Sequence, residues 1–188
     1  MTENTGGTRK RIQAVALELF TEQGYEKTSL REIAERLGVT KAALYYHFKS
    51  KDEIISSLVE DRLRRMDDLI AWAAEQPATL ATRRALVGRY ADAMFAGEMP
   101  QVMRFFEQNQ TVLKSLVAGQ RMRDRMMRLA NELCRGDDSP AAQLRAALTL
   151  FAVHSSWFAV RAPGLTDEGR KKIALEVADE LLARIGGD

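Results

Sequence analysis

The 188-residue sequence lacks the residues on which several classes of enzyme and metalloprotein depend. Its single cysteine, Cys134, excludes an intrachain disulfide and a metal site built from several cysteines. There are two histidines, His47 and His154, and the sequence contains neither a glycine-rich phosphate loop nor a His-Glu-x-x-His zinc motif. These absences argue against an enzyme, so we expect no catalytic residue, no metal and no cofactor.

Long apolar runs and helix-breaking residues are scarce as well. No stretch reaches the roughly 18 apolar residues of a membrane span, and residues 1–8 are polar, without the apolar centre of a signal peptide. With four prolines and no strictly alternating runs, the sequence favours helices over strands. We therefore expect an all-α protein that stays in the cytoplasm and has no membrane partner.

The charges are nearly balanced in total but unevenly distributed. The net charge is only +2, yet nine lysines and arginines stand against five glutamates between Thr8 and Lys51. A basic excess concentrated in the first quarter of a chain is typical of a surface that contacts phosphates. The distribution, and not the total charge, indicates nucleic acid as a partner.

Apolar residues recur at helical spacing, and capping residues divide the chain into short helices followed by long ones. Ser29 and Glu32 have the spacing of a capping box, and Gly38 is a stop signal for the short helix after them. Thr40 is the expected N-cap of a second short helix that ends near His47. Longer helices are expected at about 50–72, 79–96, 100–134 (continuous or broken), 140–161 and 166–185.

This pattern predicts two helical domains joined by the long helix that opens near Asp52. Residues 8–61 are expected to form a three-helix DNA-binding domain, with a helix-turn-helix at about 29–48. Residues 62–188 are expected to form a larger helical domain. Such a fold presents its second short helix to the major groove of DNA.

The second short helix has an outer face that is poorly suited to a protein core. With Leu44 turned inward, the residues left on the outside are Lys41, Ala42, Tyr45 and Tyr46. Two tyrosines, a lysine and a small alanine suit a groove, because they offer flat rings, hydroxyls, a cation and room for a thymine methyl.

The run Gly38-Val-Thr-Lys-Ala-Ala-Leu-Tyr-Tyr-His-Phe48, with lysines at 49 and 51, resembles the signature of the TetR family of transcriptional regulators. The resemblance covers about Thr8 to Asp61. It implies a two-fold dimer on a palindromic operator, with base-edge contacts from Arg31, Lys41, Ala42 and Tyr46. It also implies phosphate contacts from Thr28, Thr40, Tyr45, His47 and Lys51. For Tyr45 and His47 the alternative is packing between helices.

The larger domain is rich in methionines and aromatic residues, which adapt to varied apolar shapes. The resemblance implies an effector site there, and the candidates for binding a small apolar effector are Trp72, Met94, Phe95, Met103, Phe106, Met126, Trp157 and Phe158. An ordinary helical core is the alternative for each of them. Arg121, Arg125 and Arg128 share a helical face, which we interpret as solvated, the alternative being a site for an anionic effector.

The last two predicted helices are the candidates for the dimer interface. The helix at 146–161 mixes small residues with Phe151, Trp157 and Phe158, and small residues let helices approach closely. His154 in this helix is interpreted as structural, with ligand binding or a response to pH as the alternative. The leading hypothesis is a ligand-responsive repressor, and the alternatives are a helical enzyme and a nonspecific nucleoid protein.

Overall fold

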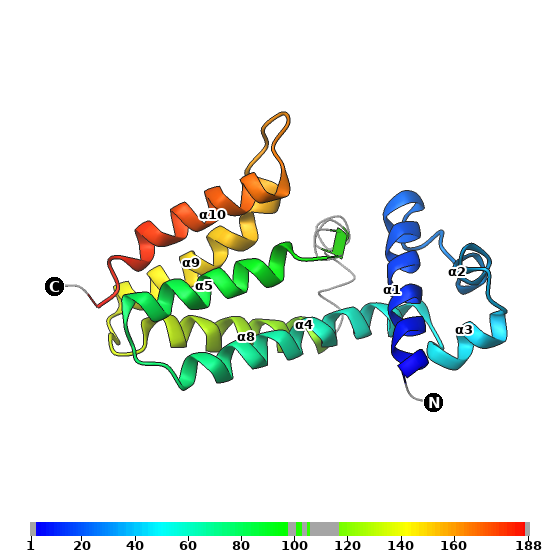
Figure 1. Ribbon diagram of the computed structural model, residues 1–188, viewed down its shortest axis with the longest axis horizontal. Helices are drawn as coiled ribbons and strands as arrows, with labels where there is room; N and C mark the ends of the chain where they lie inside the picture. Colours follow the sequence, from blue (N-terminus) through cyan, green and yellow to red (C-terminus); the bar gives the residue numbers. More distant parts are fainter. Residues whose placement is uncertain (1–2, 98–100, 103–104, 106–116, 187–188) are drawn as a thin grey trace. The chain divides into compact units, whose positions relative to one another are not determined.

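The computed structural model describes residues 3–97, 101, 102, 105 and 117–186, and within these ranges the chain is helical with no strand, which confirms the all-α prediction. The described helices are α1 (Glu3–Gln23), α2 (Leu30–Leu37), α3 (Lys41–His47), α4 (Lys51–Ala74), α5 (Leu80–Phe95), α8 (Val117–Cys134), α9 (Pro140–Ala159) and α10 (Asp167–Leu182) (Figure 1). None of them combines the length and apolar character needed to cross a membrane.

The chain divides into two compact units, and one of them is discontinuous. Unit 1 consists of Met1–Arg62 together with Pro100–Ala118, and unit 2 consists of Leu63–Met99 together with Gly119–Asp188. The sequence predicted two continuous domains that meet between residues 61 and 62. Unit 1 also includes Pro100–Ala118, and the division into a DNA-binding domain at 8–61 and a larger domain at 62–188 stays a prediction.

Phe105 shows what this segment contributes to unit 1. Its side chain is fully buried. The centre of its ring lies 5.6 Å from that of Phe20 and 6.2 Å from that of Tyr25. Phe20 and Tyr25 in turn meet edge to face at 5.0 Å. An aromatic ring from the middle of the chain therefore completes the core around the end of α1.

The helix ends of unit 1 follow the capping rules. Ser29 and Glu32 form the expected capping box, and Gly38 ends α2 with a φ of 69°, a left-handed conformation that glycine adopts without a steric cost. The hydroxyl of Thr40 accepts from the amide of Ala43 at 3.1 Å and so caps α3.

A variant of the capping box begins α4. The hydroxyl of Ser50 accepts from the amide of Glu53 at 3.1 Å. The Glu53 carboxylate accepts from the amide of Lys49 at 2.6 Å, one residue before the cap. This contact ties the end of the helix-turn-helix to α4.

A buried polar contact joins α1 to α4 inside unit 1. The side-chain amide of Gln13 donates to Ser57 Oγ at 2.8 Å and to Asp61 Oδ2 at 3.3 Å. Burial of the polar groups is tolerated because they hydrogen-bond to each other. Around them lies an apolar core that comprises Ile12, Ala16, Leu17, Phe20, Ile33, Ala34, Leu44, Phe48, Ile54 and Ile55.

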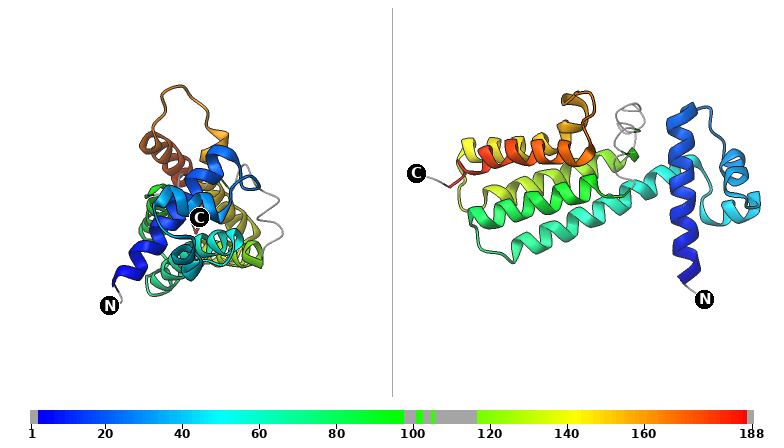
Figure 2. Two further views of the ribbon diagram at one scale, coloured as in Figure 1. Left: turned by 90° about the vertical axis from the view of Figure 1, so that its right-hand side faces the viewer. Right: turned by 45° about the horizontal axis from the view of Figure 1, so that its top comes forward.

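In unit 2, α10 packs along α9 and α5 (Figure 2). Arg83 of α5 is buried, and its guanidinium donates to the carbonyls of Leu133 (2.8 Å), Arg135 (3.2 Å) and Ile185 (2.8 Å). These carbonyls belong to chain segments that end α8 and follow α10, where helices leave carbonyls without partners. One side chain thus joins three parts of unit 2.

Candidate nucleic-acid interface

The short helix α3 is held in place by two fully buried residues on one face. Leu44 and Phe48 lie four positions apart and are both inaccessible to solvent, as expected for residues that share a helical face. The hydroxyl of Thr40 caps the first turn, and the Gly38 turn connects α3 to α2. The buried face fixes which residues of α3 remain outside.

The outer face of α3 carries an exposed aromatic and cationic surface. Tyr46 is 76% exposed, an unusually large value for a tyrosine, and Lys41 and Ala42 are also exposed. The ring of Tyr46 meets that of His47 edge to face at 5.3 Å. The ammonium group of Lys41 lies 5.5 Å from the centre of the Tyr45 ring. The exposed ring beside a cation makes this face a candidate interaction surface.

On α2, Arg31 points to solvent beside an acidic neighbour. Its Nε donates to Glu35 Oε1 at 2.7 Å, an ion pair between side chains that are 77% and 60% exposed. This hydrogen bond and the charge of Glu35 raise the pKa of Arg31. Because water screens the exposed pair, a phosphate or a base edge competes readily with Glu35 for the guanidinium.

Two of the predicted phosphate contacts have side chains that serve other purposes. Thr28 is only 2% exposed, and its hydroxyl donates to the carbonyl of Gly24 at 2.9 Å and accepts from Gln23 Nε2 at 3.2 Å. The Lys51 ammonium donates to the carbonyls of Tyr25 at 2.6 Å and Glu26 at 3.3 Å. In this structure both side chains close the turn between α1 and α2, and we interpret them as structural.

Tyr25 is the residue of this region that the sequence did not single out. Its hydroxyl donates a short hydrogen bond to the carboxylate of Asp52. Burial and the adjacent negative charge raise the pKa of Tyr25. Helical spacing and capping patterns do not indicate a role for Tyr25, because its partners Lys51 and Asp52 lie more than twenty residues later in the chain.

Unit 2 brings together some of the predicted effector-binding residues. The rings of Phe95 and Trp157 stack with centroids 4.6 Å apart, and the buried hydroxyl of Tyr90 donates to the sulfur of Met126 at 3.5 Å. Met94, also in α5, is buried. The positions of these residues fit an effector site and an ordinary apolar core equally well.

Trp72 and Phe158, two further predicted effector residues, have other aromatic or cationic neighbours. Trp72 stacks under the guanidinium of Arg89, which lies 4.2 Å from the ring centre. Phe158 is exposed and meets Phe151 at 6.4 Å. Met103 and Phe106 lie outside the described residues.

On the basic face of α8, Arg125 and Arg128 have a carboxylate partner. The guanidinium of Arg125 donates to both carboxylate oxygens of Asp67 at 3.2 Å, and Arg128 approaches the same carboxylate at 3.6 Å. Because these two arginines already pair with Asp67, we favour the interpretation of the face as solvated over that of a site for an anionic effector.

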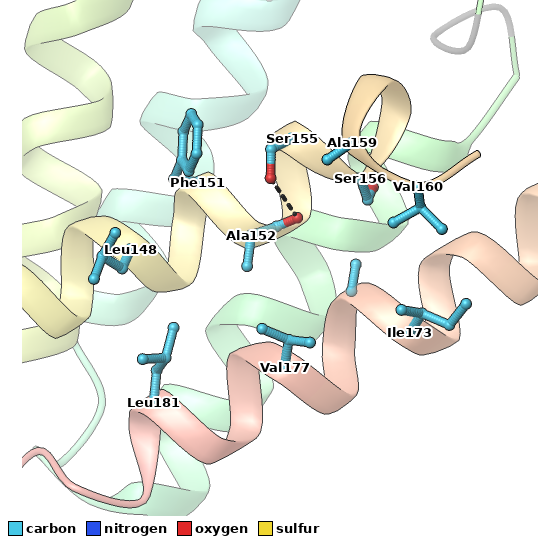
Figure 3. Close-up of a pocket in the computed structure, with 11 residues that line it drawn as sticks. Leu148, Phe151, Ala152, Ser155, Ser156, Ala159, Val160, Ile173, Val177 and Leu181 are labelled. Atoms are coloured by element: carbon cyan, nitrogen blue, oxygen red, sulfur yellow. Dashed lines mark hydrogen bonds between the residues drawn. The ribbon is translucent and has the colours of Figure 1, made fainter.

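A shallow apolar groove runs between α9 and α10 (Figure 3). It has a volume of about 300 Å³. Phe151 from α9 and Val177 from α10 line it and are 54% and 44% exposed. The other lining residues are Leu148, Ala152, Ser155, Ser156, Ala159, Val160, Ile173, Ala174 and Leu181. The helices that the sequence predicts as a dimer interface therefore present exposed apolar side chains along one face.

Comparisons with known proteins match the helix-turn-helix region most closely. Residues 12–58 match the family model described as "Bacterial regulatory proteins, tetR family". The HTH-type transcriptional regulator AcrR of Shigella flexneri is 51% identical over 53 residues, 28% of this chain and 25% of that protein. The HTH-type transcriptional repressor KstR2 of Rhodococcus jostii is 31% identical over 124 residues, 64% of this chain and 57% of that protein.

The similarity in fold extends further than the similarity in sequence. The crystal structure of AmtR from Mycobacterium smegmatis superposes with a TM-score of 0.69 at 26% identity, and covers 96% of this chain and 87% of that one. The sequence matches, in contrast, span only a quarter and just over half of the lengths of the two curated relatives.

Proposed function

Since the chain belongs to the TetR family of bacterial regulatory proteins, we propose that it is a ligand-responsive repressor that binds a palindromic operator as a dimer in the cytoplasm. The observation that carries the proposal is the outer face of α3. Tyr46 is 76% exposed beside Lys41 and Ala42, on a helix braced from behind by the buried Leu44 and Phe48. A rigid helix with an exposed, sequence-reading face is what the major groove accepts.

The contacts divide into two kinds. We assign base-edge contacts to Lys41, Ala42 and Tyr46 of α3 and to Arg31 of α2. Phosphate contacts fall to Thr40, Tyr45 and His47. Thr40 keeps its capping role while doing so, because a hydroxyl that accepts from an amide still has a proton to donate.

The dimer is assigned to the groove face of α9 and α10. A second copy of the chain, related by two-fold symmetry, brings the same two helices against this face and forms a four-helix interface. The exposed apolar residues support this assignment, because patches of this kind are costly to leave in water. A two-fold dimer places its two recognition helices on the half-sites of a palindrome.

An apolar effector is assigned to unit 2, near the stacked Phe95 and Trp157. It releases DNA only if it binds the DNA-free conformation more tightly than the DNA-bound one. The repressor role is supported by the name of the related KstR2 protein of Rhodococcus jostii.

A footprint on the DNA upstream of the gene tests the proposal. We expect the protein to protect one discrete, palindromic site at concentrations that leave the flanking DNA unprotected. Uniform protection along the fragment would instead support a nonspecific nucleoid protein.

A further inference from the structure

Three consecutive cations, Arg9, Lys10 and Arg11, lie near the start of α1, and all three are exposed. Neither the site assigned above nor the family match, which begins at residue 12, includes them. In the part of the chain that the structure describes, Lys10 and Arg11 form no ion pair. Two uncompensated positive charges therefore face solvent on unit 1.

Arg9 holds this end of α1 against the end of α3. Its guanidinium lies 4.4 Å from the centre of the Phe48 ring, and its Nη1 donates to the carbonyl of His47 at 3.5 Å. The start of α1 accordingly lies beside the last turn of α3 (Figures 1 and 2). Lys10 and Arg11 follow directly on the same helix, so their backbone lies at the end of α1 that adjoins α3.

A second contact concerns the face of α1 on which Arg11 lies. Arg11 and Glu22 lie eleven residues apart, about three helical turns, and so share one face of α1. Glu22 forms an ion pair with Arg36 of α2 at 3.2 Å. The face of α1 that carries Arg11 is thus the face turned toward α2, the first helix of the helix-turn-helix.

From this placement we propose that Lys10 and Arg11 bind backbone phosphates of duplex DNA that flank the bases read by α3. The inference rests on the proposed DNA-binding function and adds a second contact element to it. Exposed, flexible cations without an acidic partner suit phosphates, which supply affinity and position the protein without reading sequence.

The test compares a variant that removes these charges with two matched variants. Lys10→Gln/Arg11→Gln removes both charges while keeping side chains that favour a helix. Lys10→Arg/Arg11→Lys keeps both charges. Arg65→Gln/Lys172→Gln removes two exposed positive charges from unit 2 and controls for net charge. Each protein is titrated by fluorescence anisotropy against the duplex upstream of the gene and against a scrambled duplex, over a series of salt concentrations.

We expect the Lys10→Gln/Arg11→Gln variant to reduce the slope of log K against log salt by about 1.8, because each phosphate contact contributes about 0.9. Its affinity at about 0.1 M salt falls roughly 60-fold on both duplexes, so that discrimination between them is retained. The charge-keeping variant and the unit 2 control bind like the wild type.

An unchanged slope in Lys10→Gln/Arg11→Gln, or an equal loss in the charge-keeping variant or the unit 2 control, overturns the inference. Failure of the proposed function looks different: the wild-type protein itself then shows no salt-sensitive binding to either duplex.

Discussion

The ammonium group of Lys51 donates a 2.6 Å hydrogen bond to the carbonyl of Tyr25 and lies 4.4 Å from the centre of that ring. Tyr25 in turn donates from its hydroxyl to Asp52, the neighbour of Lys51. The two contacts fasten the turn before α2 to the first turn of α4. The orientation of the helix-turn-helix within unit 1 therefore depends on residues at the start of α4.

This relationship predicts that Lys51 stabilises unit 1 without contributing to the salt dependence of DNA binding. Lys51→Met should lower the free energy of unfolding by about 2 kcal/mol, the usual contribution of a hydrogen bond to a charged group. The slope of log K against log salt should stay at the wild-type value. Lys27→Met, which changes an exposed lysine in the same unit, serves as the control for stability. A slope reduced by about 0.9 would instead make Lys51 a phosphate contact.

Unit 2 should depend strongly on Arg83. Arg83→Met leaves the carbonyls of Leu133, Arg135 and Ile185 without their donor, and we expect a loss of about 3 kcal/mol in the free energy of unfolding. Urea denaturation followed by tryptophan fluorescence measures it, since both tryptophans, Trp72 and Trp157, belong to unit 2.

The neighbouring Arg84 provides the matched control for this prediction. Its ion pair with Asp179 is exposed, and exposed pairs contribute little to stability. Arg84→Met should therefore shift the urea midpoint far less than Arg83→Met does. Equal shifts for the two variants would show that the three hydrogen bonds of Arg83 stabilise unit 2 no more than the exposed ion pair of Arg84 does.

Unit 1 should require Phe105 for a complete core. Phe105→Ala removes a fully buried ring packed on Phe20 and Tyr25, a change that costs about 3–5 kcal/mol in protein cores. We expect faster amide hydrogen exchange in α1 and little change in α9. Tyr46→Ala, which removes an exposed ring from the same unit, should leave exchange in α1 unchanged. Wild-type protection of α1 in Phe105→Ala would mean that unit 1 is complete without the segment.

The groove between α9 and α10 should determine the oligomeric state. Phe151→Glu places a charge in the proposed interface, where burial without a partner is costly, so we expect a monomer in sedimentation equilibrium. Met127→Glu changes a residue that is 65% exposed on α8, outside the groove, and should leave the dimer intact. A dimeric Phe151→Glu protein, or a monomeric Met127→Glu protein, would show that the groove does not form the dimer interface.

Much of the helix-turn-helix could be predicted from the sequence because it is specified locally. Ser29 caps α2 through Glu32, and Thr40 caps α3 through Ala43, all within three residues. Leu44 was identified as inward-facing from the sequence, and it is fully buried.

The interactions that the sequence did not indicate join residues that lie apart in the chain. Lys51 finds its acceptor 26 residues earlier, at Tyr25. Thr28 was assigned to phosphate by its position in a motif, although its hydroxyl bonds backward to the end of α1. The packing of Phe105 against Phe20 spans most of the first half of the chain, and no local pattern encodes it.

The central claim is that the outer face of α3 reads DNA sequence, and the most direct test measures discrimination in Tyr46→Ala and Lys41→Ala. Fluorescence anisotropy compares their affinity for the upstream duplex and for its scrambled counterpart, with Lys172→Ala as a control outside unit 1. Each lost base contact should reduce discrimination by about 1–3 kcal/mol, roughly 5-fold to 150-fold, while Lys172→Ala matches the wild type. Wild-type discrimination in both α3 variants would contradict the account.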